Sequence, residues 1–273
     1  MKTWLITGAS SGLGLSMSRR LLDRGDRVIA AVRRPDPLSA LKTRYPERLK
    51  ILTFDLTDTA ALRCEVDAAF SGGRIDVVVS NAGYGLFGAA EEAADAQIDR
   101  QIATNLVGSI QLIRAVLPHL RTQGGGLVQQ VSSEGGQVAY PAFSLYHATK
   151  WGVEGFVESV AQEVAPFGIR FTLVEPGPTA TGFGAGLDLT EPMSVYDATP
   201  AGDVRRAVLG GGFEIRGDAD RTVEAMIVAA DADAPPRRLT LGSAAFENIE
   251  AALTARLGEL RDQRDVAYGA DRS

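Results

Sequence analysis

Short apolar runs alternate with segments of helical periodicity along most of the chain. The apolar runs cover residues 3–7, 27–32, 49–54, 75–80, 126–131 and 169–174. Segments around 13–24, 58–70, 95–121 and 145–165 lie between them. Apolar strands that alternate with helices are typical of a parallel sheet with helices on both faces. We therefore predict one α/β domain over residues 1–273, a Rossmann-type doubly wound sheet of about seven strands. A last strand is expected at 238–241 and a last helix at 245–261.

Residues 182–217 break this alternation. They are rich in glycine at both ends, and their irregular middle contains Leu187, Leu189 and Met193. Long loops in α/β folds are usually functional or disordered, and this one is too apolar for a plain linker. We call residues 182–217 the lid segment and expect it to be a mobile cover over a substrate pocket.

The composition excludes several kinds of protein. Hydrophobic residues make up 45% of the chain, charged residues 23%, and the net charge is −6, which does not favour a nucleic-acid-binding surface. The single Cys64 cannot form an internal disulfide, and with only two histidines it makes no credible soft-metal site. The N-terminus has no signal-peptide pattern, and no run of about 18 apolar residues is present. We expect a cytoplasmic enzyme without metal, nucleic-acid or membrane partners.

Three glycines, Gly8, Gly12 and Gly14, lie between the first expected strand and the first expected helix. Glycine permits a positive φ and a close backbone approach, and a helix N-terminus offers free N–H groups to a phosphate. A plain tight turn is the alternative for this G-x-x-x-G-x-G spacing. Its place at the first strand-to-helix turn, where open α/β sheets bind dinucleotides, favours a phosphate site.

Polar residues follow two later strands. Asp55 and Leu56 come after the third apolar run, and residues 81–83, Asn-Ala-Gly, come after the fourth. A carboxylate at position 55 can accept a hydrogen bond from an adenine amino group. Asp and Asn are also common turn and capping residues, so neither motif is specific by itself.

Tyr146 and Lys150 lie four positions apart near the start of the expected helix 145–165, so they share one helix face. A tyrosine is a poor base at neutral pH because its unperturbed pKa is about 10. An ammonium beside it favours the phenolate and should lower that pKa, which suits proton exchange with a carbonyl or alcohol oxygen. A surface pair is the alternative, but Ser133 after a strand end and Asn105 in the preceding helix support a reactive site.

Together these motifs resemble the short-chain dehydrogenase/reductase family, in its compact single-domain branch, over roughly the first 180 residues. Asn105, Ser133, Tyr146 and Lys150 match the family's catalytic tetrad in order and spacing. The resemblance implies that Tyr146 is the general acid/base and that Ser133 binds the substrate oxygen. It also implies that Lys150 holds the nicotinamide ribose and lowers the tyrosine pKa, while Asn105 orders a water in a proton relay.

The same resemblance implies a set of contacts to the dinucleotide. These are Gly8, Ser10, Ser11, Gly12, Leu13, Gly14, Arg33, Asp55, Leu56, Asn81, Ala82, Gly83, Tyr146, Lys150, Pro176, Gly177, Thr179 and Thr181.

The end of the second expected strand predicts which nicotinamide cofactor is used. Enzymes that bind NAD usually have an acid there, about 20 residues past the glycine turn. This chain has Val32, followed by Arg33 and Arg34. An arginine at position 33 can meet a 2′-phosphate with charge-assisted hydrogen bonds, whereas Arg34 is expected to be a solvated charge. This resembles the NADP(H) pattern, although some NADP-using relatives have a basic residue where this chain has Ser11.

The substrate is expected to be a small molecule with an apolar body. Candidate pocket residues are Tyr84, Leu86, Phe87, Val138, Tyr140, Phe143 and Phe183, with core packing as the alternative for each. They come without clustered arginine or lysine to hold a carboxylate or phosphate. We predict an NADP-dependent enzyme that transfers hydride between nicotinamide and a moderately hydrophobic ketone, aldehyde or secondary alcohol, as a homodimer or homotetramer.

Two other functions on this fold remain open. A non-catalytic NADP-binding regulator would not need Tyr146 and Lys150 together. A sugar-nucleotide epimerase or dehydratase shares that pair, but usually has tighter glycine spacing and a longer C-terminal domain. His147 is expected to be structural, because adjacent residues on a helix diverge by about 100°.

Overall fold

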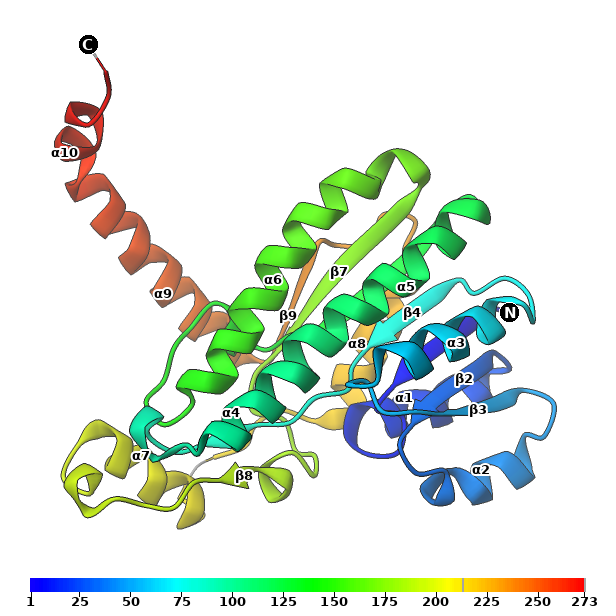
Figure 1. The fold of residues 1–273 in the computed structure, drawn as a ribbon, viewed down its shortest axis with the longest axis horizontal. Coiled ribbons are helices and arrows are strands. Elements are labelled where there is room, and N and C mark those ends of the chain that lie inside the picture. The colour runs from blue at the N-terminus through cyan, green and yellow to red at the C-terminus, as the bar shows by residue number, and fades with distance from the viewer. Residues whose placement is uncertain (213, 273) are drawn as a thin grey trace.

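The computed structural model describes residues 1–212 and 214–272, so residue 213 of the lid segment and residue 273 lie outside it. Seven parallel strands form the central sheet (Figure 1). Their spatial order is β3 (Leu49–Thr53), β2 (Arg27–Val32), β1 (Thr3–Thr7), β4 (Val77–Ser80), β6 (Gly126–Val131), β7 (Ile169–Pro176) and β9 (Arg238–Leu241). The predicted doubly wound α/β fold is confirmed.

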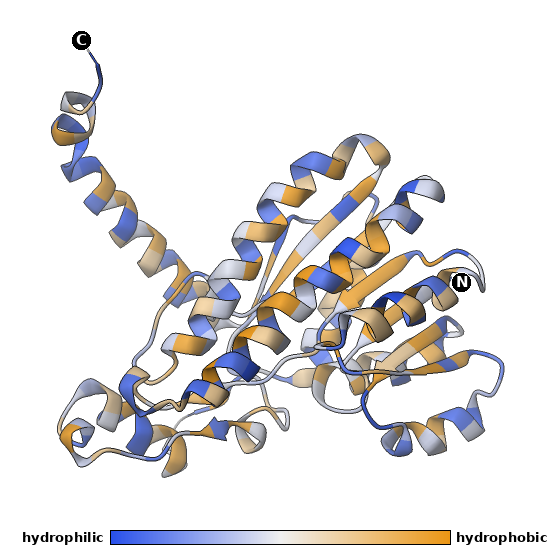
Figure 2. Cartoon of the chain, in the orientation of Figure 1, coloured by the Kyte–Doolittle hydropathy of each residue, from blue (hydrophilic) through white to orange (hydrophobic). Residues whose placement is uncertain are grey.

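Helices cover both faces of this sheet. One face packs against α1 (Gly12–Arg24), α2 (Ser39–Arg44) and α8 (Ala219–Asp231). The other face packs against α3 (Thr59–Phe70), α5 (Ser109–Thr122) and α6 (Ser144–Val164). The strands between them are largely hydrophobic (Figure 2). Successive strand residues point to opposite faces, so Trp4 and Ile6 belong to one core while Leu5 belongs to the other.

Helix α8 is not among the expected elements, although its sequence carries a start signal. The Asp218 carboxylate accepts a hydrogen bond from the N–H of Arg221 at 2.8 Å, which caps the first turn. Val223, Met226 and Ile227 then pack into the core beside α1.

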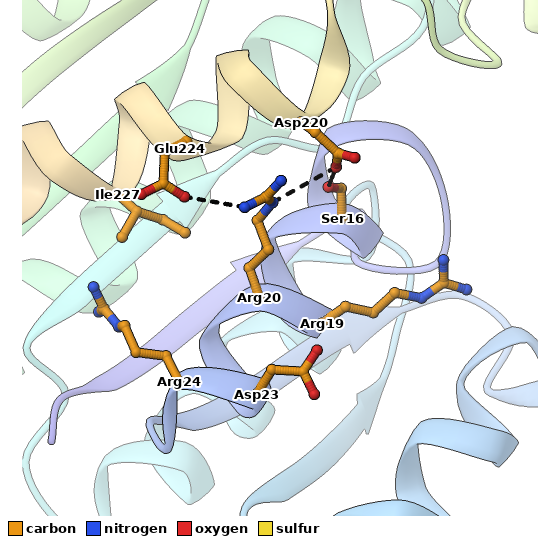
Figure 3. A pocket seen from close by; sticks show the side chains of 8 residues that line it. All are labelled: Ser16, Arg19, Arg20, Asp23, Arg24, Asp220, Glu224 and Ile227. Carbon is orange, nitrogen blue, oxygen red and sulfur yellow. Dashed lines mark hydrogen bonds and ion pairs between the residues drawn. The ribbon is translucent and has the colours of Figure 1, made fainter.

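Polar pairs line the outer edge of the contact between α1 and α8 (Figure 3). Arg20 reaches Glu224 at 3.1 Å and Asp220 at 3.6 Å, and Ser16 donates to Asp220 at 2.7 Å. Exposed pairs of this kind contribute at most about 1 kcal/mol each. The apolar side chains beneath them therefore contribute most to holding α8, and these ion pairs line the hollow between the two helices.

The single helix expected over 95–121 is divided into three parts. It consists of α4 (Asp95–Gln101), a π-helical stretch (Ile102–Gly108) and α5, which begins at Ser109. A π-helical stretch often marks a functional position, and Asn105 lies at its centre.

The chain ends in α9 (Ser243–Asp262) and α10 (Arg264–Gly269). These helices continue past the end of the sheet and project away from the body of the fold (Figure 1). Within the described part of the chain, no helix combines the length and the apolarity that a membrane crossing requires.

The lid segment is more ordered than its sequence suggests. It contains β8 (Asp188–Leu189), which pairs in parallel with β5 (Leu86–Phe87), and it contains α7 (Pro200–Leu209). Neither two-residue strand is expected from the sequence, because strands this short leave no periodicity. The expected irregular middle is thus partly regular, while its mobility stays a prediction.

One buried carboxylate anchors the lid segment to the body. Glu92 accepts hydrogen bonds from the N–H of Met193 at 2.8 Å and from the guanidinium of Arg205 at 2.6 Å. Its side chain is fully buried, and that of Arg205 is 13% exposed. Burial opposes ionisation, but these bonds and one from the N–H of Ala89 outweigh it and lower the pKa of Glu92. Such a pair is costly to break, because one buried charge is left uncompensated.

We expect Arg205→Met to release the lid segment locally. Amide exchange across 188–209 should quicken at least about tenfold, since losing a charged hydrogen bond costs roughly 1.5–3 kcal/mol. Arg206→Met is the matched control, because Arg206 is exposed and pairs only with surface groups. Equal exchange in both variants, measured by hydrogen–deuterium mass spectrometry, would show that Glu92 does not anchor the segment.

Candidate active site

A cavity of about 1830 Å³ opens at the carboxyl ends of the strands. In open α/β sheets ligands bind at this edge, where the strand order reverses; here β2 and β4 flank β1. The volume exceeds the roughly 300–1,000 Å³ of most small-molecule pockets. It therefore has room for two ligands at once.

Most sequence-predicted site residues line this cavity. They are Gly8, Ser10, Ser11, Gly12, Leu13, Arg33, Asp55, Leu56, Asn81, Ala82, Gly83, Ser133, Tyr146, Lys150, Pro176, Gly177, Thr179 and Thr181, with Tyr84, Tyr140, Phe143 and Phe183.

The glycine turn is shaped for close backbone approach. Gly8 and Gly12 have φ angles of 66° and 51°, which favour glycine. A Cβ on Gly8 would lie 2.9 Å from the Cα of Ala82, and one on Gly14 would lie 2.4 Å from the Gly8 carbonyl oxygen. Gly14 does not line the cavity, and its predicted contact with the cofactor stays a prediction; glycine is needed there because the turn folds back on itself.

Asn81 fixes the glycine turn to the end of β4. Its Nδ2 donates to the Thr7 carbonyl at 2.9 Å. The Thr7 hydroxyl in turn accepts from the N–H groups of Asn81 and Ala82 at 3.0 and 3.1 Å. The neighbouring strand ends β1 and β4 thereby present one continuous backbone surface to the cavity.

Ionic groups gather at the ends of β2 and β3. Val32 is buried, Arg33 and Arg34 are exposed, and all three line the cavity. Asp55 accepts from the Thr57 N–H at 2.9 Å, and this bond is the main reason that the pKa of Asp55 is lowered. The charge of Arg33 lowers it further, which places the arginine near the carboxylate.

Helix α6 brings Tyr146 and Lys150 to the opposite side of the cavity. The Lys150 ammonium lies 5.5 Å from the centre of the Tyr146 ring and donates to the carbonyl of Val131 at 3.0 Å. Tyr146 is 9% exposed and Lys150 7%. The Ser133 hydroxyl lies in the loop between β6 and α6, where it accepts a hydrogen bond from the Gly135 N–H at 3.1 Å.

Burial dominates the protonation of this pair. It raises the pKa of Tyr146 to about 12, partly offset by a hydrogen bond with Ser133. It lowers the pKa of Lys150 to about 8, opposed by the charge of Glu154. Both shifts disfavour the charged form, as desolvation does. The expectation that the tyrosine pKa is lowered is therefore wrong in direction, and Tyr146 is a neutral hydrogen-bond donor at neutral pH.

A buried ionic network supports this side of the cavity from behind. Glu154 accepts from the Ser132 hydroxyl at 2.5 Å and from Arg238 at 2.7 Å. Arg238 also pairs with Glu175, which is fully buried. A Cβ on Gly136 would lie 1.8 Å from Glu154 Oε1, so this position requires glycine. The network ties α6 to the ends of β6, β7 and β9.

Asn105 lies one layer behind the cavity. Its Nδ2 donates to the carbonyl of Tyr84 at 2.8 Å, and its Oδ1 accepts from the Tyr84 N–H at 3.1 Å. The side chain is 3% exposed and does not line the cavity. Asn105 therefore fixes the loop after β4, with its amide group already engaged.

Three residues of the predicted substrate pocket lie elsewhere. Leu86 and Phe87 are buried in β5, where Phe87 packs into a small core with Phe143 at 4.7 Å between ring centres. Val138 does not line the cavity. Core packing, the alternative named for each, explains Phe87. The aromatic residue that faces the Tyr146 ring from the lid segment is Phe183, with 5.6 Å between the ring centres.

His147 has the expected structural role. Its Nε2 accepts from the Tyr140 N–H at 3.0 Å, and its Nδ1 lies 2.9 Å from the Gly135 carbonyl. Burial lowers the pKa of His147, which favours this neutral form. The ring clamps the loop after Ser133 onto α6.

Sequence reasoning misses several cavity residues from distant segments. Arg100 of α4 and Asp188 of β8 line the cavity and pair at 3.0 Å. Glu134 and Asn248 also line it, the latter from α9. Only Glu134, next to Ser133, carries a local signal; the others are brought together by the tertiary fold.

Comparisons with known proteins agree with this geometry. The family model for short chain dehydrogenases matches residues 2–192. The oxidoreductase BOA17 of Botryotinia fuckeliana is 36% identical over 249 residues, which is 90% of each chain. A solved short-chain dehydrogenase from Streptomyces avermitilis is 35% identical, with a TM-score of 0.91 over 99% of this chain and 100% of that one.

A more distant solved structure agrees in fold. It is a short-chain dehydrogenase from Burkholderia cenocepacia in complex with NADP, 24% identical, with a TM-score of 0.74 over 96% of this chain and 98% of that one. From the family match and the arrangement of the cavity, the chain belongs to the short-chain dehydrogenase/reductase family and is an oxidoreductase that uses a nicotinamide cofactor.

Proposed function

We propose that the protein transfers hydride between NADP(H) and a moderately hydrophobic ketone, aldehyde or secondary alcohol. The observation that carries this proposal is the meeting of Ser133, Tyr146 and Lys150 in the cavity that also holds the glycine turn and Arg33. A non-catalytic regulator would have no use for a buried tyrosine–lysine pair.

The cavity residues fit a dinucleotide. Gly8 and Gly12 shape the turn at the N-terminus of α1, where free N–H groups favour an anion and would hold the pyrophosphate. Asp55 would accept from the adenine, and Arg33 would bind the 2′-phosphate. The cofactor, when bound, supplies or accepts the hydride at its nicotinamide ring.

The reactive side chains divide the proton chemistry between them. Tyr146, whose pKa burial raises to about 12, is protonated at neutral pH and can donate to a carbonyl oxygen. Ser133 would hydrogen-bond the same oxygen. Lys150 would hold a ribose hydroxyl and return a proton to Tyr146. Asn105 would support this relay by fixing the loop at Tyr84.

The substrate end of the cavity has an apolar wall. Phe143, Phe183, Leu187 and Val204 line it. The arginines nearby are already paired, Arg100 with Asp188 and Arg216 with Glu214. An uncharged carbonyl body fits this wall better than a carboxylate or a phosphate.

The proposal extends to a cytoplasmic homodimer or homotetramer. Exposed apolar side chains on α9, among them Leu253, Leu257 and Leu260, support association.

We expect Tyr146→Phe to retain cofactor binding and to lose turnover by at least about a hundredfold, because it removes the proton donor. Tyr45→Phe is the control, since Tyr45 lies in the core and does not line the cavity. NADPH titration and steady-state reduction of a ketone panel measure the two effects. Near-normal kcat in the Tyr146→Phe variant would exclude Tyr146 from the reaction.

Wild type should prefer NADPH over NADH by at least about tenfold in kcat/KM, because a charged hydrogen bond contributes roughly 1.5–3 kcal/mol. The double variant Val32→Asp with Arg33→Leu should reverse the order, because it adds a carboxylate that repels the 2′-phosphate of NADPH and removes the guanidinium that would bind it. Arg34→Leu is the matched control and should change the ratio little. An unchanged ratio in the double variant, or an equal effect of Arg34→Leu, would contradict the assignment to Arg33.

Reductase activity should decline with an apparent pKa near 8, where the Lys150 ammonium loses its proton, while Tyr146 stays protonated until about pH 12. The Glu154 carboxylate raises the pKa of Lys150, so Glu154→Gln should move the decline to lower pH. Glu158→Gln removes a half-exposed partner of Arg238 and serves as the control. A pH profile that does not move, or moves upward, in Glu154→Gln would exclude this coupling.

A further inference from the structure

A second polar cluster lines the cavity beside the reactive side chains. It consists of Glu134, the residue after Ser133, Tyr140 in the following loop, and Asn248 on α9. The hydride transfer proposed above does not use any of the three. Asn248 is the only one that comes from the projecting C-terminal helix, which therefore takes part in forming the cavity.

The cluster has unused capacity for hydrogen bonds. Glu134 is 5% exposed, and Asn248 Nδ2 donates to its Oε2 at 3.2 Å. The buried Tyr140 hydroxyl lies close enough to this carboxyl and to Asn248 to interact with both, but within the described residues neither contact is a well-formed hydrogen bond. Buried polar groups are nearly always paired, and each exception requires an explanation.

The polar cluster is held in a fixed position relative to Tyr146. The Tyr140 N–H donates to His147, which directly follows Tyr146 in α6, and the same imidazole contacts the carbonyl of Gly135. The charge of Glu134 contributes to the raised pKa of Tyr146, so the two groups are within electrostatic reach. A substrate whose carbonyl meets Tyr146 and Ser133 therefore has the Glu134 carboxyl nearby.

A purely structural role explains the cluster less well. A contact that only held α9 in place would not need a carboxyl group in the cavity wall, because burial is costly for a charge. That cost is visible here, since burial raises the pKa of Glu134. Asn248 uses only one acceptor position of this carboxyl, so further positions are left for a donor in the cavity.

We propose that Glu134, Tyr140 and Asn248 form a substrate subsite for a hydrogen-bond donor. The preferred substrates would be ketones or aldehydes that carry a hydroxyl or an amino group near the carbonyl, or the corresponding diols and amino alcohols. This rests on the proposed carbonyl reduction and narrows its substrate class. A site that holds buried polar groups for a donor discriminates against analogues that lack it, because those groups are then left unpaired.

Matched ketones test the subsite. Three compounds share one carbon skeleton and carry, near the carbonyl, no donor, a hydroxyl group or an amino group. Wild type should favour at least one donor-bearing ketone over the plain one by about tenfold or more in kcat/KM, the discrimination expected where a buried polar group would otherwise be left unpaired. Glu134→Gln should reduce that ratio, and Glu134→Leu should abolish it. The hydroxyl and amino arms identify which donor is bound.

Controls separate the subsite from the fold and from the basic reaction. Glu224→Gln alters a carboxylate of α8 that does not line this cavity and should keep the wild-type ratio. Tyr140→Phe removes only the hydroxyl and should lower the ratio in the same direction as Glu134→Leu. No preference in wild type, or an equal loss on all three ketones in Glu134→Leu, overturns the subsite. Failure of wild type to reduce any carbonyl compound would instead overturn the proposed function.

Discussion

A buried cation constrains the reactive end of this fold. Lys150 is 7% exposed, and placing an ammonium there costs several kcal/mol unless its hydrogen bonds and counter-charges are in place. Its ammonium donates to the carbonyl of Val131 at the end of β6, and the charge of Glu154, one helical turn further, favours its protonated form. Both contacts depend on the register of α6 against the sheet. That register also places Tyr146 beside Ser133.

The surrounding structure holds this register. Glu154 connects α6 to Ser132 and to Arg238 of β9, and Arg238 connects onward to Glu175 of β7. The close contact between Gly136 and Glu154 leaves no room for a larger residue in the loop that follows Ser133. The geometry of the site therefore depends on charges buried behind it as much as on the residues that face the cavity.

The sequence predicts well those features that are local in the chain. Apolar runs identify the seven strands of the main sheet, because the five inner strands are buried on both faces and the edge strands β3 and β9 are partly buried. The i, i+4 spacing of Tyr146 and Lys150 identifies a shared helix face. Gly8 and Gly12 are identified by their position at the first strand-to-helix turn, and both adopt the positive φ that glycine permits.

Features that depend on distant contacts cannot be predicted in this way. Phe87 looks like a pocket residue because it follows the Asn-Ala-Gly motif. In the structure, however, it lies in the two-residue strand β5, which pairs with β8, and its side chain is buried in a small hydrophobic core. The direction of the Tyr146 pKa shift depends on how deeply the ring is buried, which spacing does not reveal. Asn248 lies more than 100 positions from the serine loop that it contacts.

Whether a feature can be predicted from the sequence depends on whether its residues are close together in the chain. Most residues that we propose to bind the cofactor lie on strand-to-helix connections, and Tyr146 and Lys150 lie near the start of α6, so their order in the chain reveals them. The parts that would select a substrate come from the lid segment, from α4 and from α9, which meet only in the folded cavity. Glu134 belongs to both groups, because it follows the reactive serine in sequence and meets the C-terminal helix in space. In the proposed subsite, chemistry and selectivity would be joined at this residue, and a change at Asn248 of the C-terminal helix would alter which substrates the same side chains accept.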